Sequence, residues 1–349
     1  MVRVGIIGAG FIGRNHFNQY EKMRDRATVT LLCDKDADRR AGDWSKVLGN
    51  IADAQGTKRD LGGIRPCIDW QDVINDPQVD LVDICAPTFL HRDIAVAALK
   101  AGKSVLCEKP MALSVEQCDE MLAAARGARG KFMVAQCIRF WPEYVYLREA
   151  VRSKRYGELR SLELRRFAGT PDYSLGNWIV NPELSGGAVL DLHVHDVDFA
   201  LGLFGKPASV VAQGYQRAGG GVDRVHAQWF YRGVERVTQI NGAWDLPNGF
   251  RFNMGFTAVF ENAALTFDMN PEVPLTLLRP KQDPERPGLP TQDAYHGEIE
   301  HMLDCIEHNR EPSITTPAES RDAVAIALAE KRSALTGRVV EISNTVSAT

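Results

Sequence analysis

Lys109 has the residue type and the placement needed to act on a hydroxyl group. It lies in the tripeptide Glu108-Lys109-Pro110, directly after an apolar run. Pro110 cannot extend a central strand, so the chain must turn where Lys109 emerges. A lysine that is partly removed from water and lies beside a positive charge has a lowered pKa, which suits proton transfer or orientation of a hydroxyl group. A surface lysine paired with Glu108 is the alternative when the tripeptide is considered alone.

The densest cluster of ionisable side chains lies between residues 185 and 198. On a helix, Asp191, His195 and Asp198 are spaced at i, i+4 and i+7 and share one face. A carboxylate beside an imidazole fixes its tautomer and raises its basicity, which suits a general base. His193 and His195 diverge by about 200° around a helix, so we expect no shared metal ion. His193 is then either a substrate contact or a core residue, and a purely structural cluster is the remaining alternative.

A glycine-rich loop, Gly8-Ala9-Gly10-Phe11-Ile12-Gly13, follows the apolar run Val2–Ile7 and precedes a helical pattern. In that context the backbone N–H groups and the helix dipole can bind a pyrophosphate. Asp34 ends the second apolar run, where a carboxylate accepts hydrogen bonds from ribose hydroxyls and repels a 2′-phosphate. The loop therefore predicts a dinucleotide, NAD in preference to NADP. The alternative is a packing turn, with Asp34 as a helix cap.

Cationic side chains near Asp34 keep NADP open as a cofactor. Lys35, Arg39 and Arg40 follow the carboxylate within a few residues and can bind a phosphate. Further along, Ala86-Pro87-Thr88-Phe89-Leu90-His91 follows another apolar run. Thr88 is placed to cap the next helix and to face the nicotinamide half of the cofactor. His91 either faces the cofactor or is an exposed residue of the first helical turn.

The elements that must position these residues alternate regularly through residue 136. Near-continuous apolar strands separated by helices of about 12 residues predict βαβ units and a parallel, doubly wound sheet. The polar interval 41–67 predicts an irregular insertion. The expected strands are Val2–Ile7, Thr28–Cys33, Val79–Cys85, Ser104–Cys107 and Phe132–Gln136, and the expected helices are Phe11–Met23, Leu90–Ala101 and Val115–Arg126.

The pattern changes after about residue 150. Apolar residues occupy every second position in Phe250–Phe260 and in Val225–Tyr231, which predicts antiparallel strands with two distinct faces. Helical patterns run through Ala188–Phe204, Ala294–His308 and Pro317–Thr336. We therefore expect an α/β domain at 1–136 and an α+β domain at 137–349.

Composition limits the classes of partner. The chain has 349 residues, 44% of them apolar and 25% charged, and a net charge of −4. Neither half carries a long run of one charge sign, so a nucleic-acid or membrane-surface partner is not expected. No apolar stretch approaches the roughly 18 residues that span a bilayer. The seven cysteines include no CxxC pair, and no cleavage-like segment precedes the first strand. We expect reduced thiols and a cytoplasmic protein.

The motifs together resemble those of the Gfo/Idh/MocA oxidoreductase family, the glucose–fructose oxidoreductase and inositol dehydrogenase group. The resemblance covers essentially the whole chain. It rests on Gly8-x-Gly10-x-x-Gly13, on Ala86-Pro87-Thr88-x-x-His91, on Glu108-Lys109-Pro110 and on Gly186-Gly187 followed by Asp191-x-x-x-His195. Membership implies an N-terminal Rossmann domain and a C-terminal domain on a large, open, mostly antiparallel sheet. One face of that sheet carries helices and the active site, and the other makes homodimer or homotetramer contacts.

The resemblance also implies roles for particular residues. Lys109 is the catalytic lysine, His195 the acid/base and Asp191 its partner at the substrate. Glu108 and Lys109 are also expected to contact the cofactor. Arg139 and Pro142 fall in a segment that lines the approach to the nicotinamide. Trp178 either stacks on a sugar or is an ordinary core residue.

The leading hypothesis is an NAD(P)-dependent dehydrogenase or reductase for a secondary alcohol or ketone of a sugar, inositol or related polyol. The second domain has no strongly basic constellation for a nucleotide-sugar diphosphate, which favours an unphosphorylated cyclic substrate. We expect the Lys109 amine and the His195 imidazole to meet over one nicotinamide ring. The alternatives are a glycoside hydrolase with a tightly held NAD, and a non-catalytic dinucleotide-binding regulator. The regulator is disfavoured because the chain retains both Lys109 and His195.

Overall fold

The structure is a computed structural model that describes residues 1–349 except 50–56, 217–220, 248, 271, 273–274 and 344–349. It forms two compact units. Unit 1 comprises residues 1–137, 173–178 and 293–321, and unit 2 comprises residues 138–172, 179–292 and 322–349. The first boundary lies one residue from the expected division at 136/137. Residues 173–178 and 293–321 differ from that division, because they belong to unit 1 although the sequence places them in the second expected domain.

Unit 1 is built on a six-stranded sheet in the order β3-β2-β1-β4-β5-β6. All of its neighbouring strands are parallel. The strands are β1 (Val2–Ile7), β2 (Ala27–Cys33), β3 (Arg65–Cys67), β4 (Leu81–Ile84), β5 (Ser104–Glu108) and β6 (Phe132–Ala135). This confirms the doubly wound sheet. From β1 the strand order runs towards one edge of the sheet through β2 and β3, and then towards the other edge through β4, β5 and β6. Ligands of such sheets bind at this switch between β1 and β4, outside the carboxyl ends of the strands.

Helices cover the sheet of unit 1 and explain its continuous apolar strands. Every residue of β4, β5 and β6 is buried, as expected where both faces of a parallel sheet are covered. Ser114 caps α5 by accepting a hydrogen bond from the Gln117 N–H. The helices are α1 (Phe11–Lys22), α2 (Ala37–Arg40), α3 (Trp70–Asn75), α4 (His91–Lys100), α5 (Val115–Arg126) and α9 (Ala294–Glu307).

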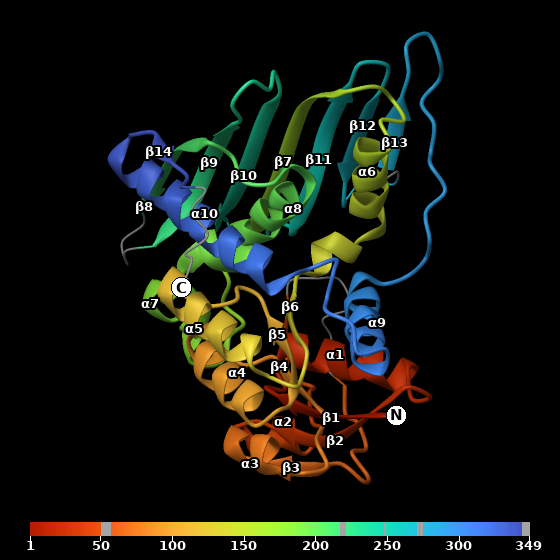
Figure 1. Ribbon diagram of the computed structural model, residues 1–349, viewed down its shortest axis with the longest axis vertical. Coiled ribbons are helices and arrows are strands. Elements are labelled where there is room, and N and C mark those ends of the chain that lie inside the picture. The colour runs from red at the N-terminus through yellow and green to blue at the C-terminus, as the bar shows by residue number, and fades with distance from the viewer. Residues whose placement is uncertain (50–56, 217–220, 248, 271, 273–274, 344–349) are drawn as a thin grey trace. The chain divides into compact units, whose positions relative to one another are not determined.

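Helix α9 completes the core of unit 1 although it lies far along the chain. Its side chains Ile299, Met302 and Leu303 are fully buried in one cluster with Phe17 and Tyr20 of α1. Figure 1 shows α9 beside α1. An ion-pair network reinforces this packing, because the partly buried Arg26 guanidinium contacts the α9 carboxylates of Glu300, Asp304 and Glu307. Part of the apolar surface of unit 1 is thus buried only by a late segment.

Unit 2 is built on an eight-stranded sheet in the order β13-β12-β11-β7-β10-β9-β8-β14. Its pairs are antiparallel except β10 with β7, which confirms the large, mostly antiparallel sheet. The strands are β7 (Leu159–Gly169), β8 (Ser209–Gln216), β9 (Val222–Phe230), β10 (Val237–Leu246), β11 (Asn253–Phe260), β12 (Ala264–Asp268), β13 (Leu275–Leu278) and β14 (Val340–Glu341). Burial alternates along β7 and β9, as the apolar pattern predicts.

One face of the large sheet packs against α6 (Pro142–Arg152), α8 (Val194–Phe204) and α10 (Pro317–Thr336), which lie on the viewer's side in Figure 1. The Tyr144 ring contacts Phe199, Phe256 and Phe267 edge-on, with centroids 4.9, 5.3 and 5.7 Å away. Such pairs add about 0.5–1.5 kcal/mol each beyond the area they bury. The outer face instead exposes the apolar residues Phe230, Val237, Val259 and Leu278.

Several elements differ from the sequence-based expectation. The helix expected at Ala188–Phe204 begins with a π-helical segment, η4 (Val189–His193), before α8. Strand β11 begins at Asn253 rather than at Phe250. Strand β3 lies at the end of the interval expected to be irregular, of which residues 50–56 are outside the described residues.

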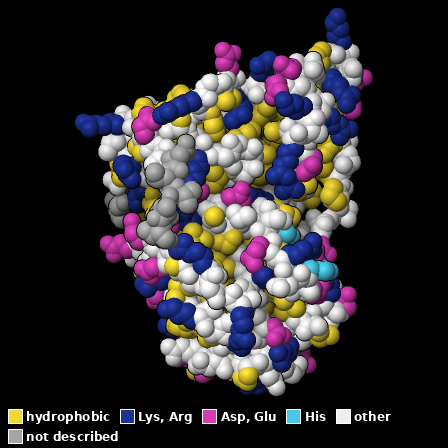
Figure 2. Space-filling view, viewed as in Figure 1, with side chains coloured by type: hydrophobic (Ala, Val, Ile, Leu, Met, Phe, Trp, Pro, Cys, Tyr) yellow, Lys and Arg dark blue, Asp and Glu magenta, His cyan; other side chains and the backbone are white. Residues whose placement is uncertain are grey.

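Within the described residues, every helix is too short or too polar to span a lipid bilayer. On the face shown in Figure 2, basic and acidic side chains are interspersed among the described residues. All seven cysteines are free thiols.

Candidate active site

The loop between β1 and α1 depends on two glycines that permit close backbone packing. Gly8 has a φ of +100°, and a Cβ there would lie 2.4 Å from the Cys85 carbonyl oxygen. A Cβ at Gly13 would lie 1.8 Å from the Gly8 carbonyl oxygen. Gly10 differs, because its Cβ would approach only the Arg39 guanidinium, at 3.7 Å. Helix α1 has no side-chain cap, so no capping side chain competes with a pyrophosphate for its first N–H groups.

Asp34 fastens this loop to the end of β2. Its Oδ2 accepts a hydrogen bond from the Ala9 N–H at 2.7 Å, and its Oδ1 accepts one from the Asp36 N–H at 2.8 Å. The cap of α2 is Asp36, which accepts from the Arg39 N–H at 3.0 Å. Each carboxylate oxygen has two lone pairs, so Asp34 retains the capacity to accept hydrogen bonds from ribose hydroxyls. Asp34 itself does not cap α2.

The cationic side chains near Asp34 differ in their surroundings. The Arg40 Nη1 donates to the carbonyl oxygens of Asp34 and Lys35, at 2.7 and 2.8 Å. Its charge therefore lies against the turn backbone. Arg39 extends towards the glycine loop, as its distance from the Gly10 position shows. Lys35 is exposed. Arg39 and Lys35 are thus the side chains with the reach to meet a phosphate here.

Other predicted cofactor residues lie at the start of α1 and after β4. Phe11 and Ile12 are half-buried in the first turn of α1, Pro87 is half-buried, and Ala86 and Thr88 are buried. Thr88 begins a short 3-10 helix, η1 (Thr88–Leu90), and α4 starts after it without a side-chain cap. This corrects the expected capping role of Thr88. The 3-10 turn lies between Thr88 and α4, so that Leu90 occupies the N-cap position of α4.

His91 is buried rather than exposed or directed at a cofactor. Its Nδ1 lies 2.9 Å from the Pro110 carbonyl oxygen, and its Nε2 lies 2.9 Å from the Ala86 carbonyl oxygen. Burial lowers the pKa of His91, so the neutral ring donates to one carbonyl at a time. His91 thus links the loops after β4 and β5. This corrects the expectation that His91 faces the cofactor.

Lys109 emerges at the carboxyl end of β5, half-buried. Its backbone N–H donates to the Glu108 Oε2 at 3.0 Å, and the Lys109-Pro110 peptide bond is cis. Because β5 pairs with β4, and β4 with β1, the Lys109 turn lies at the same sheet edge as the glycine loop. Glu108 is buried, so it is not a surface partner of the lysine.

A buried charged cluster that sequence reasoning missed adjoins Glu108. His16 of α1 places Nδ1 2.9 Å from the Asp83 Oδ2, and Nε2 3.2 Å from the Glu108 Oε1 and 3.6 Å from the Glu298 Oε1. The Tyr20 hydroxyl donates to the Asp83 Oδ2 at 2.9 Å. The signal in the sequence was Asp83, a carboxylate inside an otherwise apolar strand.

The charges of this cluster shift one another's pKa values. Burial would lower the pKa of His16, but Asp83 and the neighbouring Cys85 outweigh it and raise that pKa well above its usual value. Burial raises the pKa of Glu298 to about 8, with His16 opposing and Glu108 adding to the increase. These shifts favour the cationic form of the imidazole and the neutral form of the Glu298 carboxyl group.

In unit 2, His193 is a core residue. Its Nε2 lies 2.6 Å from the Glu330 Oε2 of α10, and the Glu330 Oε1 accepts from the Trp229 Nε1 at 2.5 Å. All three side chains are buried. A Cβ at Gly242 of β10 would lie 2.7 Å from the His193 Nδ1. Of the two roles that the sequence left open, the structure selects the core role.

Two buried ion pairs fix the next turn of this helix. Arg166 of β7 donates to both carboxylate oxygens of Asp196, each at 3.0 Å. Arg139 donates to both carboxylate oxygens of Asp198, at 2.6 and 2.9 Å. These fork-like pairs are directional as well as strong. Asp198 therefore does not join Asp191 and His195 on one exposed face, which corrects the spacing argument.

Between residues 191 and 198, Asp191 and His195 are the two partly exposed positions, and all the others are buried. The π-helical turn and the anchors on His193, Asp196 and Asp198 produce this difference. A half-buried carboxylate and a half-buried imidazole, whose Nδ1 is itself buried, thus lie on a rigid support in unit 2.

Arg139, expected at the approach to the nicotinamide, instead anchors α8. Its guanidinium also donates to the Asp198 carbonyl oxygen at 3.1 Å, and a Cβ at Gly202 would lie 2.8 Å from it. Pro142 is the first residue of α6. Trp178 is half-buried in a short 3-10 segment, η3 (Leu175–Val180).

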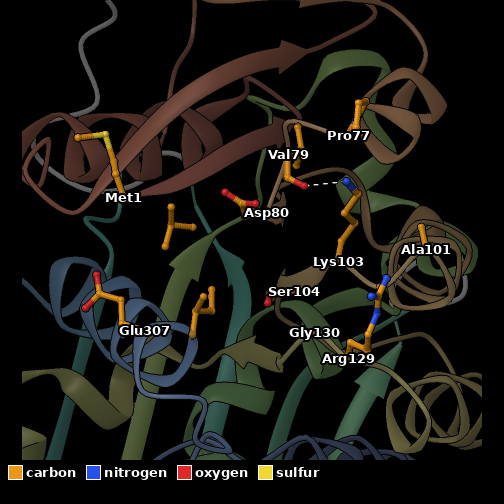
Figure 3. Close-up of a pocket in the computed structure, with 13 residues that line it drawn as sticks. Met1, Pro77, Val79, Asp80, Ala101, Lys103, Ser104, Arg129, Gly130 and Glu307 are labelled. Atoms are coloured by element: carbon orange, nitrogen blue, oxygen red, sulfur yellow. Dashed lines mark hydrogen bonds between the residues drawn. The ribbon is translucent and has the colours of Figure 1, made fainter.

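A hollow of about 520 Å³ lies at the opposite edge of the unit 1 sheet (Figure 3). It is lined by Met1, Asp80, Lys103, Ser104 and Glu307, among others. The Lys103 Nζ donates to the carbonyl oxygens of Asp76 and Val79, at 2.6 and 2.7 Å. This hollow is at the amino ends of β1, β4 and β5, away from the glycine loop and Lys109.

Family models match both parts of the chain. One, described as an oxidoreductase family with an NAD-binding Rossmann fold, matches residues 2–136. Another, described as the GFO/IDH/MocA C-terminal domain, matches residues 144–265.

The individual proteins that match this chain are distant relatives. Trans-1,2-dihydrobenzene-1,2-diol dehydrogenase of Xenopus laevis is 36% identical over 148 residues, which span 42% of this chain and 44% of that protein. The match thus covers less than half of that relative. 1,5-Anhydro-D-fructose reductase of Ensifer adhaerens is 28% identical over 294 residues, 78% of this chain and 82% of that protein. A levoglucosan dehydrogenase structure in complex with NADH has a TM-score of 0.83 at 21% identity, covering 99% of this chain and 100% of that chain. That likeness concerns the fold.

Proposed function

The chain belongs to the GFO/IDH/MocA oxidoreductase family, and from that membership we propose that it interconverts a secondary alcohol and a ketone of a sugar, inositol or related polyol. The nicotinamide of a bound NAD or NADP would accept or supply the hydride. The observation that carries the proposal is the contrast within the 191–198 segment. His193, Asp196 and Asp198 are locked to buried partners, whereas Asp191 and His195 are partly exposed.

We assign Lys109 the task of orienting and polarising the substrate oxygen. Its position beside the glycine loop, at the carboxyl edge of the unit 1 sheet, supports this assignment. His195 takes the hydroxyl proton in oxidation and returns it in reduction, and Asp191 is its partner at the substrate. Holding the oxygen between two such groups provides orientation as well as proton transfer.

The charges near Asp34 support a cofactor preference, and a compared protein supports a substrate class. Asp34 faces the place of the adenosine ribose and favours NAD, although Arg39 and Lys35 leave NADP as the second choice. The compared protein named 1,5-anhydro-D-fructose reductase carries the name of an unphosphorylated sugar derivative. An uncharged cyclic polyol or sugar is therefore the proposed substrate class.

The test is a panel of inositols, aldoses, anhydrosugars and keto-sugars with NAD and with NADP. Lys109→Ala and His195→Ala should each lower kcat/KM by about 10²–10⁴, the usual contribution of a positioned acid or base. The exposed Lys100→Ala and His308→Ala are matched controls and should retain full activity. A Lys109→Ala enzyme with most of its turnover would refute the assignment. Cleavage of a chromogenic glycoside without added cofactor would show hydrolysis instead.

We also propose that the outer face of the large sheet joins subunits into a homodimer or homotetramer. Phe230, Val237, Val259 and Leu278 expose apolar surface on that face. Open sheets commonly bury such residues against a second copy.

A further inference from the structure

We propose that Glu298 is a buried carboxylic acid that keeps its proton at neutral pH, and that Glu298 and His16 together position the Glu108 carboxylate to which the Lys109 peptide is bonded. Both are positioning residues, since neither is placed to touch the substrate. The proposal rests on the role assigned to Lys109 under the proposed function.

The geometry connects Glu298 to Lys109 through two contacts. The His16 Nε2 lies 3.2 Å from the Glu108 Oε1 and 3.6 Å from the Glu298 Oε1. The other oxygen of Glu108, Oε2, accepts the Lys109 N–H at 3.0 Å. Glu108 therefore lies between the imidazole and the peptide that carries the lysine. Any displacement of its carboxylate moves an acceptor of the Lys109 backbone.

The excess of carboxyl groups over cations favours a proton on at least one carboxyl group. Within the described residues, α1 contributes His16 and Tyr20, β4 and the residue after it contribute Asp83 and Cys85, β5 contributes Glu108, and α9 contributes Tyr295 and Glu298. One imidazolium thus faces three carboxyl groups. An unpaired ionised carboxylate in such a site is strongly unfavourable, and the usual response is to bind a proton.

Glu298 is the carboxyl group that takes the proton. Asp83 receives hydrogen bonds from His16 and Tyr20, and Glu108 receives one from the Lys109 N–H. Neither oxygen of Glu298 receives a hydrogen bond from any described residue, and the side chain is fully buried. It is therefore the least stabilised as an anion.

The same donors have the types that bind a divalent cation. The ligand atoms of His16, Glu108 and Glu298 all lie within 4.8 Å of one another. A metal ion needs the lone pair of a neutral imidazole. Asp83 and Glu108 instead place carboxylate oxygens 2.9 and 3.2 Å from the two ring nitrogens. The Nε2 contact is an ion pair without hydrogen-bond geometry, and two neighbouring carboxylates favour the protonated ring. We favour the proton over the cation for this reason.

A pH response follows from this arrangement. Above the pH at which Glu298 ionises, two carboxylates, Glu108 and Glu298, share the positive charge of His16 at Nε2. Glu108 is then held less firmly, and so is the turn at Lys109. The affinity for NADH should fall at alkaline pH, because Glu108 and Lys109 are both predicted cofactor contacts.

The experiment uses the full chain with NADH as the probe, so it needs no identified substrate. Glu298→Gln mimics the protonated acid at every pH. We expect it to bind NADH within about twofold of wild type at pH 7. Between pH 7 and 9.5 we expect wild type to lose about tenfold in affinity and Glu298→Gln less than threefold. The control is Glu307→Gln, an exposed carboxylate on the same helix, which should follow wild type.

Infrared spectroscopy of the protein alone measures the proton directly. Wild type and Glu307→Gln should show a protonated-carboxyl carbonyl stretch at pH 7 that Glu298→Gln lacks. His16→Gln keeps a donor but removes the cation that opposes the raised pKa of Glu298, so its loss of NADH affinity should begin about one pH unit higher than in wild type. This second variant decides the matter if Glu298→Gln folds poorly.

Three results would overturn the proposal: an infrared band that persists in Glu298→Gln, identical pH profiles of Glu298→Gln and wild type, or one equivalent of bound metal by elemental analysis. Its failure is distinct from failure of the proposed function. A wild-type enzyme inactive on the whole substrate panel would refute the function, while the infrared and NADH measurements would still decide the state of Glu298.

Discussion

At the scale of single residues, Asp34 performs two tasks with one carboxylate. It accepts the Ala9 N–H of the glycine loop, and it stands where an adenosine ribose would bind. A substitution there therefore affects loop order as well as cofactor choice. The neighbouring Asp36 serves only as the cap of α2, which provides a matched control.

Asp34→Ala should weaken NAD binding more than NADP binding, because it removes the ribose acceptor and the repulsion of a 2′-phosphate. It should also lower the free energy of unfolding by about 1–3 kcal/mol, the cost of an unsatisfied partly buried donor. Calorimetric titration with both cofactors and urea unfolding measure the two effects. Asp36→Ala should leave the NAD/NADP ratio unchanged. An equal loss for both cofactors in Asp34→Ala would contradict the ribose role.

The raised pKa of Glu298 predicts how the free energy of unfolding depends on pH. Because burial raises its pKa in the folded protein to about 8, the folded state retains a proton that the unfolded chain releases near its ordinary pKa of about 4.5. The stabilisation that this proton contributes is fully present below the ordinary pKa. It is lost as the pH rises through about 8. At about 1.4 kcal/mol per pKa unit, the loss is at most about 5 kcal/mol. Urea unfolding at pH 5.5 and pH 8.5 should show a smaller difference for Glu298→Gln than for wild type.

Residues that end strands were predictable, but their partners were not. Gly8, Asp34 and Lys109 follow apolar runs, and the parallel sheet places such ends at one edge. The links from Asp34 to Ala9 and from His16 to Glu298 join residues 25 and 282 positions apart in the sequence. No local pattern encodes such separations. His91 shows the same limit, because its carbonyl partners become visible only when two loops are placed together.

At the scale of elements, the helix that carries Asp191 and His195 is supported from three directions. Glu330 of α10 holds His193, Arg166 of β7 holds Asp196, and Arg139 holds Asp198. Sequence spacing assumed 3.6 residues per turn throughout. The π-helical segment breaks that assumption, so the i, i+7 relation to Asp198 failed while the helix itself was predictable.

Removing one anchor should destabilise this helix markedly. Arg139→Leu leaves the Asp198 carboxylate buried without its cation, which costs about 3–5 kcal/mol. The double variant Arg139→Leu/Asp198→Leu should recover part of that loss. Urea unfolding and a double-mutant cycle measure both values. Lys154→Ala, which removes an exposed ion pair with Glu158, is the control and should not change the midpoint. A single-variant loss as small as the control's would show that the pair does not anchor α8.

At the scale of the whole molecule, the sequence anticipated a parallel sheet followed by a mostly antiparallel one. It did not anticipate that residues 173–178 and 293–321 belong to the first unit. An amphipathic helix such as α9 reveals which of its faces is buried, but not which distant surface buries it. The meeting of the Lys109 amine and the His195 imidazole stays a prediction, which a crystal structure with NAD and a substrate would check.

The outer face of the large sheet provides the prediction at this scale. Val259→Lys places a charge in the apolar surface proposed to join subunits, so it should shift the protein towards smaller species. Light scattering coupled to size-exclusion chromatography measures the mass. Leu335→Lys, at an exposed position of α10, is the control and should keep the wild-type mass. A wild-type protein that is monomeric at micromolar concentration would refute the proposal.

The burial of Ile299, Met302 and Leu303 against α1 has a consequence for biosynthesis. When a ribosome has released residues 1–137, the strands of the first sheet are complete, but the helix that seals one flank has not been made. At about 5–20 residues per second, that flank stays uncovered for roughly ten to thirty seconds. A nascent chain stalled in this interval should therefore be a client of chaperones, and release from them should await translation of α9.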